Sequence, residues 1–253
     1  GAEHMIQDLH AHTYYSFDSQ DKIEKVVETA IANGIELLGI TDHNYGIAYP
    51  STEMVYDKGP ALDSDYGSGL LRYYDHMKLI KEKYKNRIKI LSGIEVATLI
   101  CKERYALPDK TDISYFDYCL VENLDNVNHS TVHGDIFSFA RRCGCPTGIA
   151  HTDMFKFISD IGEEPNSYFR KMAANNIFWE INVNYDSLHG FHIHEYVTDF
   201  FKDKTQQDIV KKSGVKLSVG FDSHRINEYK ADRVKTANKL IKDMGIKLMF
   251  DNL

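Results

Sequence analysis

The sequence has no excess of positive charge and no long apolar run. Its 253 residues hold 30 Lys and Arg against 37 Asp and Glu, which gives a formal net charge of -7. Proteins that bind long nucleic acids usually have a basic balance, so we do not expect such a partner. Because no stretch reads as a membrane span or as a signal peptide, we expect a cytoplasmic protein without membrane contact.

Cysteine is scarce, and its positions suggest no metal or disulfide framework. The four residues are Cys101, Cys119, Cys143 and Cys145, and none of them has zinc-finger spacing. We expect free thiols in a reducing compartment. Residues 1–4 resemble a remnant of recombinant expression in front of Met5, so we expect no function for His4.

Short apolar runs alternate with amphipathic stretches along the chain. The expected strands lie at Ile6–Leu9, Leu37–Thr41, Ile88–Val96, Tyr118–Val121, Thr147–Ala150, Phe178–Val183 and Val215–Gly220, with a last short one at Gly245–Phe250. The expected helices lie at Lys22–Asn33, Tyr73–Tyr84, Ile136–Arg142, Phe169–Asn175, Thr198–Ser213 and Asp232–Met244. This alternation predicts parallel βαβ units in one α/β domain, 1–253. A closed barrel and an open doubly wound sheet both satisfy it.

One segment does not follow this alternation. Residues Asn44–Gly69 are rich in Gly, Asp, Ser and Tyr, and we expect them to form a long loop beside the second strand. Long loops in compact domains are often functional.

Polar side chains that bind metals follow one strand after another. They are His10, His12, Asp42, His43, Glu95, His151, Asp222 and His224. The carboxyl ends of parallel strands face one side of such a fold, so these groups should meet in one cavity. Imidazole and carboxylate together suit zinc, iron or manganese. A second His-x-His pair, His192 and His194, has no strand-end carboxylate, and we interpret it as a surface loop or a helix start.

The chain resembles the PHP family, named for polymerase and histidinol phosphatase domains. The motifs that carry the resemblance are DLHAHTYYSFDS from Asp8, GITDH from Gly39, GIEV from Gly93, IAHTD from Ile149 and VGFDSH from Val219. Their order and spacing agree with the family over almost the whole chain. The resemblance implies a distorted (β/α)7 barrel, similar to a TIM barrel, with two or three divalent metals (Zn, Mn or Fe).

The resemblance also implies roles for individual residues. One metal would be held by His10, His12, Glu95 and Asp222. Glu95 would bridge to a second metal that also takes His151. Asp18, His43 and His224 would hold a third, although relatives have either His or Asp at the position of Asp18. The implied catalytic residues are Glu95, Asp222 and His224.

One position departs from the family pattern. The family usually has a His shortly after the fourth strand, where it serves the second metal, and Leu124 stands there in this chain. Four nearby residues can be considered as substitutes: Glu122, Asn123, His129 and His133. The site then holds fewer metals, or holds the second one through a carboxylate.

The implied activity is hydrolysis of a small phosphate monoester, histidinol phosphate or a similar molecule, by a metal-activated hydroxide. Candidate partners for the phosphate are Lys102, Arg104, Lys156 and Arg225, each of which is equally an ordinary surface charge. The aromatic residues near the motifs line a substrate pocket or cap the barrel; they are Tyr14, Tyr15, Phe17, Tyr45 and Tyr49. Glu180 and Asn182 orient metal-bound histidines or only fill the barrel interior.

Three other functions remain open on the sequence. The first is a nuclease or nucleotide phosphoesterase of the same family. The second is an amidohydrolase, although those enzymes usually carry a metal-bridging Lys where this chain has Glu95. The third is a non-catalytic metal-binding barrel, which Leu124 favours and the rest of the ligand set opposes. No heptad or interface strip in the sequence fixes the oligomeric state.

Overall fold

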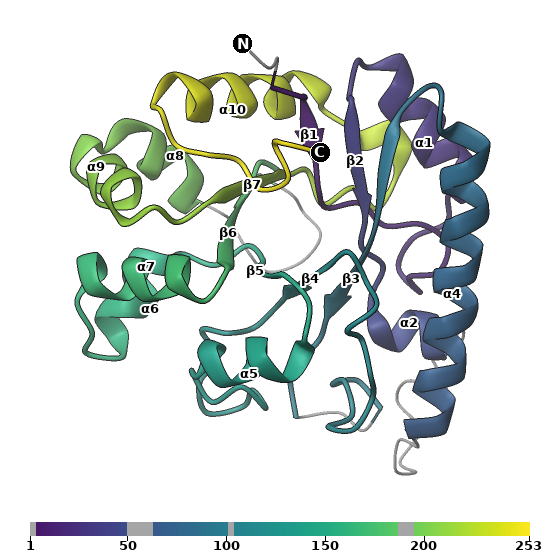
Figure 1. Cartoon of the computed structure of the whole chain (residues 1–253), viewed down its shortest axis with the longest axis horizontal. Coiled ribbons are helices and arrows are strands. Elements are labelled where there is room, and N and C mark those ends of the chain that lie inside the picture. The colour runs from purple at the N-terminus through teal and green to yellow at the C-terminus, as the bar shows by residue number, and fades with distance from the viewer. Residues whose placement is uncertain (1–3, 50–62, 101–103, 187–194) are drawn as a thin grey trace.

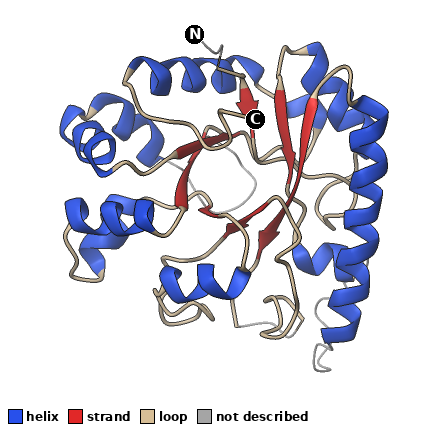
Figure 2. Cartoon of the chain, viewed as in Figure 1, coloured by secondary structure: helices blue, strands red, loops and turns tan. Residues whose placement is uncertain are grey.

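Seven parallel strands form one sheet that curves into a nearly closed barrel (Figures 1 and 2). A computed structural model describes residues 4–49, 63–100, 104–186 and 195–253 of the chain. The strands pair in chain order and are β1 (Gln7–Asp8), β2 (Leu37–Ile40), β3 (Lys89–Val96), β4 (Tyr118–Val121), β5 (Thr147–Ile149), β6 (Ile177–Asn182) and β7 (Leu217–Gly220). The predicted α/β barrel is therefore confirmed, and the open doubly wound sheet is excluded.

The barrel closes through the segments that follow β1 and β7. The amide of Leu9 donates to the carbonyl of Val219 at 2.8 Å, and the amide of Asp222 donates to the carbonyl of His10 at 2.8 Å. Asp8 strengthens the seam because its carboxylate accepts from the amide of Phe221 at 3.0 Å. This closure brings the two ends of the chain's motif series, His-x-His and Asp-x-His, side by side.

Helices surround the barrel and follow one another around it in chain order (Figure 1). They are α1 (Ile23–Ala32), α2 (Asn44–Ala48), α4 (Asp63–Tyr84), α5 (Ile136–Cys143), α6 (Met154–Asp160), α7 (Pro165–Ala174), α8 (Glu195–Lys202), α9 (Lys204–Ser213), the 3-10 turn η1 (Ile226–Glu228) and α10 (Ala231–Asp243). Among the described residues, none of the helices is both long and apolar enough to cross a membrane.

The apolar core has two parts. The larger part lies between the strands and the helices. The smaller part fills the barrel and consists of Leu9, Leu37, Leu91, Tyr118, Leu120, Ala150, Phe178 and Met249. Gly39 and Gly93 make room for the ring of Tyr118, because a Cβ would lie 1.8 Å from its hydroxyl at Gly39 and 2.8 Å from its ring at Gly93. This packed layer forms the floor beneath the polar strand ends.

The long loop predicted at Asn44–Gly69 is wrong in part. Residues 44–48 form α2, α4 already begins at Asp63, and residues 50–62 lie outside the described part of the chain. Glycine in a helix is unfavourable without tertiary support. Gly69 has that support, since it faces α2 so closely that a Cβ there would lie 3.1 Å from the Cα of Ala48.

Three other element predictions need correction. The helix expected at Thr198–Ser213 is two helices, because Asp203 interrupts it and accepts a hydrogen bond from the amide of Gln206 as the N-cap of α9. The helix expected at Phe169–Asn175 begins at Pro165, and α6 before it was missed. The expected last strand, Gly245–Phe250, contributes only an isolated bridge between Leu217 and Leu248.

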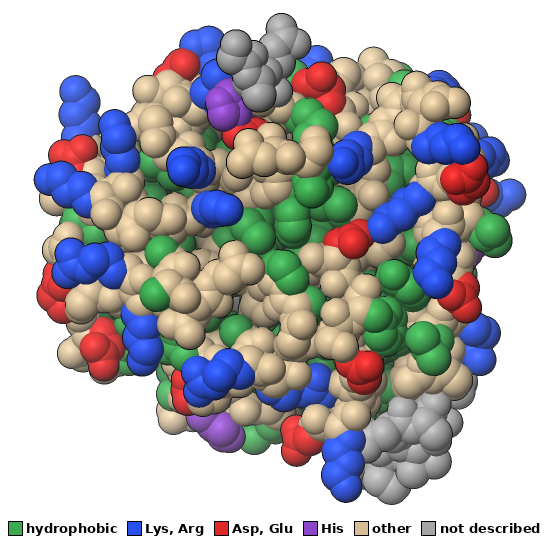
Figure 3. All heavy atoms as spheres, viewed as in Figure 1, with side chains coloured by type: hydrophobic (Ala, Val, Ile, Leu, Met, Phe, Trp, Pro, Cys, Tyr) green, Lys and Arg blue, Asp and Glu red, His purple; other side chains and the backbone are tan. Residues whose placement is uncertain are grey.

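Charged side chains are mixed on the face shown in Figure 3. Lys and Arg are scattered among Asp and Glu there, mostly toward the rim of the view. A continuous basic patch is the usual footprint of a nucleic-acid-binding surface. This face does not carry one.

Candidate metal centre

Four ligand-type side chains meet at the seam of the barrel. They are His10, His12, Glu95 and Asp222, and one ligand atom from each lies within 4.8 Å of the others. The Oδ1 atom of Asp222 lies 3.1 Å from Nε2 of His10 and 3.0 Å from Nε2 of His12. All but Asp222 are fully buried, and the Asp222 side chain is 15% exposed. Two imidazoles and two carboxylates around one point form a donor set typical of a zinc, iron or manganese site.

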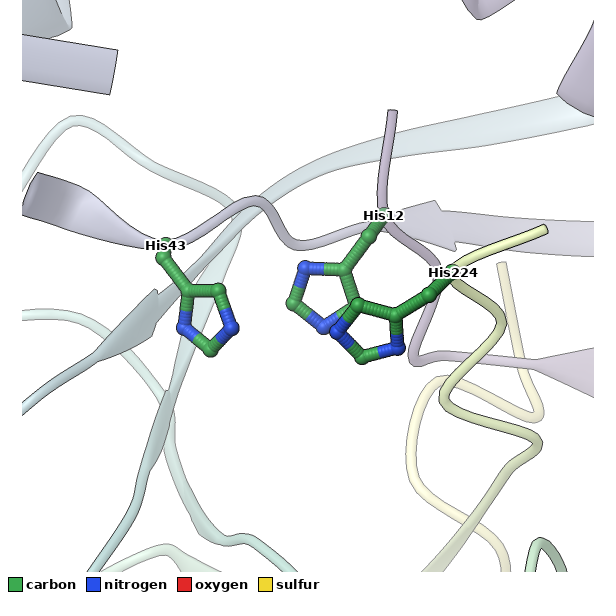
Figure 4. A group of neighbouring side chains, drawn as sticks. All are labelled: His12, His43 and His224. Atoms are coloured by element: carbon green, nitrogen blue, oxygen red, sulfur yellow. The ribbon is translucent and has the colours of Figure 1, made fainter. Parts of the chain in front are cut away.

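A second cluster joins three histidines from strand ends that are far apart in sequence. His12, His43 and His224 point toward a common space from the segments after β1, β2 and β7 (Figure 4). Asp18 borders this space, because its Oδ2 lies 3.3 Å from Nε2 of His224 and 3.8 Å from Nε2 of His43. The structure thus brings together the residues that the resemblance assigns to a third metal.

Glu95 lies at the centre of the whole group. Its Oε1 is 3.1 Å from Nδ1 of His43 and 3.3 Å from Nε2 of His12. Its Oε2 is 3.2 Å from Nε2 of His10 and 3.2 Å from Nε2 of His151. Each carboxylate oxygen therefore faces two imidazoles, which is the arrangement that a bridging carboxylate requires.

Hydrogen bonds outside the cluster fix which ring nitrogen faces inward. A carboxylate only accepts, so Nδ1 of His10 donates to Oε2 of Glu180 at 2.5 Å. Similarly, Nδ1 of His224 donates to the carbonyl of Asp222 at 3.0 Å. In both rings Nε2 then carries a lone pair that faces the interior of the cluster, as a metal-ligating histidine requires.

Ser16 has the same effect on His12. Its hydroxyl donates to Oδ1 of Asp42 at 2.7 Å, so its oxygen must accept from Nδ1 of His12 at 2.9 Å. The same oxygen accepts from the amide of His43 at 3.1 Å. Asp42 also holds the loop after β1, because Thr13 donates to it through both its amide and its hydroxyl. Ser16 was missed as a supporting residue, and Asp42, expected among the converging ligand-type side chains, instead accepts hydrogen bonds from Ser16 and Thr13.

Glu180 supports two ligands at once. Besides His10, it holds the segment of His151, whose amide donates to Glu180 Oε1 at 2.9 Å. Asn182 donates to Oε1 of Glu180 at 3.0 Å and to Oδ2 of Asp222 at 3.3 Å. Of the two interpretations left open for Glu180 and Asn182, these contacts favour the orienting one. Gly220 leaves the necessary space, because a Cβ there would lie 2.4 Å from Glu180 Oε2.

The buried charges fit a divalent metal. Both oxygens of Glu95 and Oδ1 of Asp222 accept no hydrogen bond from any residue in the described ranges. A buried carboxylate without a partner is costly, and the Nε2 atoms of His10 and His12 also face each other at 3.2 Å. A cation between these atoms would satisfy all of them together.

The pKa values show the same demand for positive charge. Burial lowers the pKa of His10, but Asp222, Glu180 and Glu95 together outweigh it and raise that pKa well above the usual value. Burial raises the pKa of Glu95, but the facing imidazoles outweigh it and hold that pKa well below its usual value. The pKa of His43 falls to about 4 chiefly through burial. A bound metal would supply the positive charge while leaving the imidazoles neutral, which is their ligating form.

Three of the seven described non-glycine residues with positive φ angles lie at strand ends beside the cluster. His151, Asp222 and Asn123 have positive φ angles of 26°, 59° and 66°. Such angles are uncommon for residues other than glycine and persist where the surroundings enforce them, often at functional sites. Here they turn the chain directly at the ends of β4, β5 and β7.

The candidate phosphate partners differ in exposure and in their neighbours. Arg104 is half-buried, with its guanidinium carbon 5.0 Å from the ring centre of Tyr49. Arg225 is exposed, and Lys156 lies 2.5 Å from Asp160 on its own helix. Lys102 lies outside the described residues, as do His189, His192 and His194.

The aromatic residues near the motifs have different surroundings. Tyr45 is buried and stacks on His43 at a ring distance of 4.8 Å and on Tyr105 at 4.2 Å. Tyr49 is buried as well, whereas Tyr14 is 48% exposed. Tyr45 therefore helps to hold His43, and its two faces are covered by other rings.

Known proteins resemble the chain over nearly all or part of its length. A probable phosphatase of Acetivibrio thermocellus is 23% identical over 96% of this chain and 88% of its own. A histidinol-phosphatase of Lactococcus lactis is 28% identical over 35% of this chain and 28% of its own. The crystal structure of histidinol phosphate phosphatase from Lactococcus lactis, complexed with zinc, L-histidinol and phosphate, shares the fold. The two structures match with a TM-score of 0.60 at 17% sequence identity, and the match covers 96% of this chain and 95% of that one.

The family itself is settled by the sequence as a whole. The sequence model of the PHP domain matches residues 8–243, which include every motif that carries the resemblance. The seven-stranded barrel and the converging strand ends agree with this match. The chain belongs to the PHP family.

Proposed function

We propose that the protein is a metal-dependent phosphatase that hydrolyses a small phosphate monoester. The observation that carries the proposal is the position of Glu95, whose two buried oxygens each face two imidazoles. Support comes from the family and from a relative named as a phosphatase that covers nearly the whole chain. The structure provides a rigid, buried donor set of the kind that metal-assisted hydrolysis needs.

The metals would be two or three divalent ions, Zn, Mn or Fe. His10, His12, Glu95 and Asp222 would hold one, Glu95 and His151 would take part in a second, and Asp18, His43 and His224 would hold a third. When bound, divalent metals polarise a phosphoryl oxygen and make water more acidic, so that hydroxide is available near neutral pH.

The chain's own residues prepare the site. Glu95 fixes the spacing of the two groups of ligands, and Glu180 and Ser16 hold the rings of His10 and His12 in place. Asp222 is the ligand-type residue of the first cluster that reaches solvent, with 15% of its side chain exposed. We assign Glu95, Asp222 and His224 to the catalytic group, with the side chain of Asp222 partly open to solvent.

Positive side chains would assist in holding the phosphate. Arg104 and Arg225 are the described candidates, and Lys102 lies outside the described residues. The guanidinium of Arg offers two parallel donors to phosphate oxygens. Replacing Arg225 with Ala should raise the KM for a phosphate monoester more than it lowers kcat, since this exposed side chain contacts no metal ligand in the described residues.

Histidinol phosphate is the specific substrate that we propose to test first, because two of the similar proteins carry its name. The test compares phosphate release from histidinol phosphate, p-nitrophenyl phosphate and the bis ester, with Mn²⁺ or Zn²⁺ added. Preferred turnover of histidinol phosphate supports the proposal. Turnover of only the diester would replace it with a nuclease-like activity, and turnover of none would favour a non-catalytic barrel.

A further inference from the structure

The segment after β4 lacks the His that members of this family usually have. The structure shows where the nearby candidate substitutes lie. Leu124 is fully buried in the outer apolar core. His129 and His133 are exposed, and His133 lines a surface groove beside α7. Neither of these two imidazoles is therefore part of the buried cluster.

The carboxylate of Glu122 faces the cluster. Glu122 is 6% exposed, and its Oε2 lies 3.8 Å from Nε2 of His151. One ligand atom from each of Glu122, Glu95 and His43 lies within 4.8 Å of the other two. The hydroxyl of Tyr105 donates to Oε1 of Glu122 at 3.3 Å, which orients the carboxylate and leaves Oε2 toward His151.

We propose that Glu122 completes the second metal position, together with Glu95 and His151, in place of the missing His. The proposal rests on the proposed function, since it concerns the same metal centre. The backbone of Glu122 is held on both sides: its amide donates to the carbonyl of Val96 at 3.1 Å, and its own carbonyl accepts from Thr98 at 2.7 Å. The side chain thus leaves a fixed point at the end of β4.

The burial of Glu95 also favours a cation at this position. Glu95 is fully buried, and its oxygens receive no hydrogen bond from the described residues. Placing a second carboxylate beside it without a cation would bring two buried like charges together, which is unfavourable. A divalent ion between Glu95, Glu122 and His151 removes this cost.

The exchange of an imidazole for a carboxylate changes which metal the position prefers. Two carboxylates and one imidazole offer more oxygen and more negative charge than a set in which a second imidazole replaces Glu122. Oxygen ligands suit Mn²⁺ better, whereas imidazole suits Zn²⁺, Fe and Cu. We infer that the second position takes Mn²⁺ more readily than a position completed by His would.

The experiment measures metal content in the absence of substrate. Wild-type protein, Glu122→Gln, Glu122→His and the exposed control Glu163→Gln are stripped of metal and equilibrated with equal Mn²⁺ and Zn²⁺. Elemental analysis gives the metals per chain, and electron paramagnetic resonance reports the bound Mn²⁺. Circular dichroism checks that each variant is folded.

We expect Glu122→Gln to lose one metal per chain, mainly Mn²⁺, while Glu163→Gln matches wild type. Glu122→His should keep the total and exchange Mn²⁺ for Zn²⁺. Unchanged metal content and an unchanged Mn-to-Zn ratio in both Glu122 variants would overturn this inference alone. Wild-type protein that takes up no metal would overturn it together with the proposed function.

Discussion

The carboxylate of Glu180 on β6 accepts a hydrogen bond from Nδ1 of His10, which follows β1, at 2.5 Å. The two residues are 170 positions apart, and both side chains are almost completely buried. This contact sets the ring orientation of His10 and raises the basicity of its Nε2. It links the last strands of the barrel to the first ligand of the candidate metal centre.

Replacing Glu180 with Gln should weaken metal binding without unfolding the protein. Loss of a carboxylate that supports a ligating His typically costs about 10- to 100-fold in metal affinity. Competition with a chromogenic chelator measures the affinity, and Glu163→Gln serves as a control at an exposed site. Equal affinity of Glu180→Gln and wild type would show that Glu180 only fills the barrel interior.

Replacing Ser16 with Ala should have a similar but separate effect on His12. The change removes the acceptor of His12 Nδ1 and of the His43 amide, so that neither ring is held as firmly. We expect metal affinity to fall by roughly tenfold. Ser223→Ala is the matched control, because that buried hydroxyl donates to the carbonyl of Arg225 and not to a ligand-type side chain. A loss of equal size in both variants would contradict the assigned role.

Removing metal should lower thermal stability. One metal site at a free metal concentration of 100 times Kd stabilises the folded state by about 2.7 kcal/mol. With roughly 2–4 °C per kcal/mol for a chain of this size, chelation should lower the Tm by roughly 5–10 °C. Differential scanning calorimetry with a chelator, and again after Mn²⁺ or Zn²⁺ is restored, measures the change. An identical Tm in all three states would argue against a metal in this buried cluster.

The break between α8 and α9 leads to a prediction about stability alone. Asp203 caps α9 by accepting from the amide of Gln206 at 3.1 Å, and Asp203→Ala should therefore cost about 1 kcal/mol of unfolding free energy. Asp208→Ala, an exposed change inside the same helix, should be neutral or slightly stabilising. Urea unfolding measures both. Metal content should stay at the wild-type level in both variants.

Much of the site was predictable because it depends on local sequence. Each ligand-type residue lies at or just after the carboxyl end of an apolar strand, so strand positions alone indicated that His10, His43, Glu95, His151 and Asp222 would converge. The supporting contacts were not predictable in this way. The contact of Glu180 with His10 requires β6 to lie near β1. The contact of Ser16 with Asp42 requires the loop after β1 to fold onto the end of β2. The first follows from closure of the barrel, and the second from the pairing of β1 with β2.

The errors in the predicted elements have two causes, one local and one tertiary. Helical spacing continues through Thr198–Ser213, so periodicity alone does not reveal the stop at Asp203. The start of α4 has a composition typical of loops, yet Tyr66, Leu70 and Tyr73 are fully buried in the core. Tertiary packing therefore outweighs the low helix propensity of its glycines.

The role of Glu95 is the central claim, and one comparison tests it directly. Phosphate release from a monoester is measured for wild type and Glu95→Gln, each equilibrated with Mn²⁺ or Zn²⁺, with metal content and circular dichroism determined on the same samples. We predict turnover by wild type, and loss of turnover together with reduced metal content in a folded Glu95→Gln. Full turnover with normal metal content in Glu95→Gln would contradict the account.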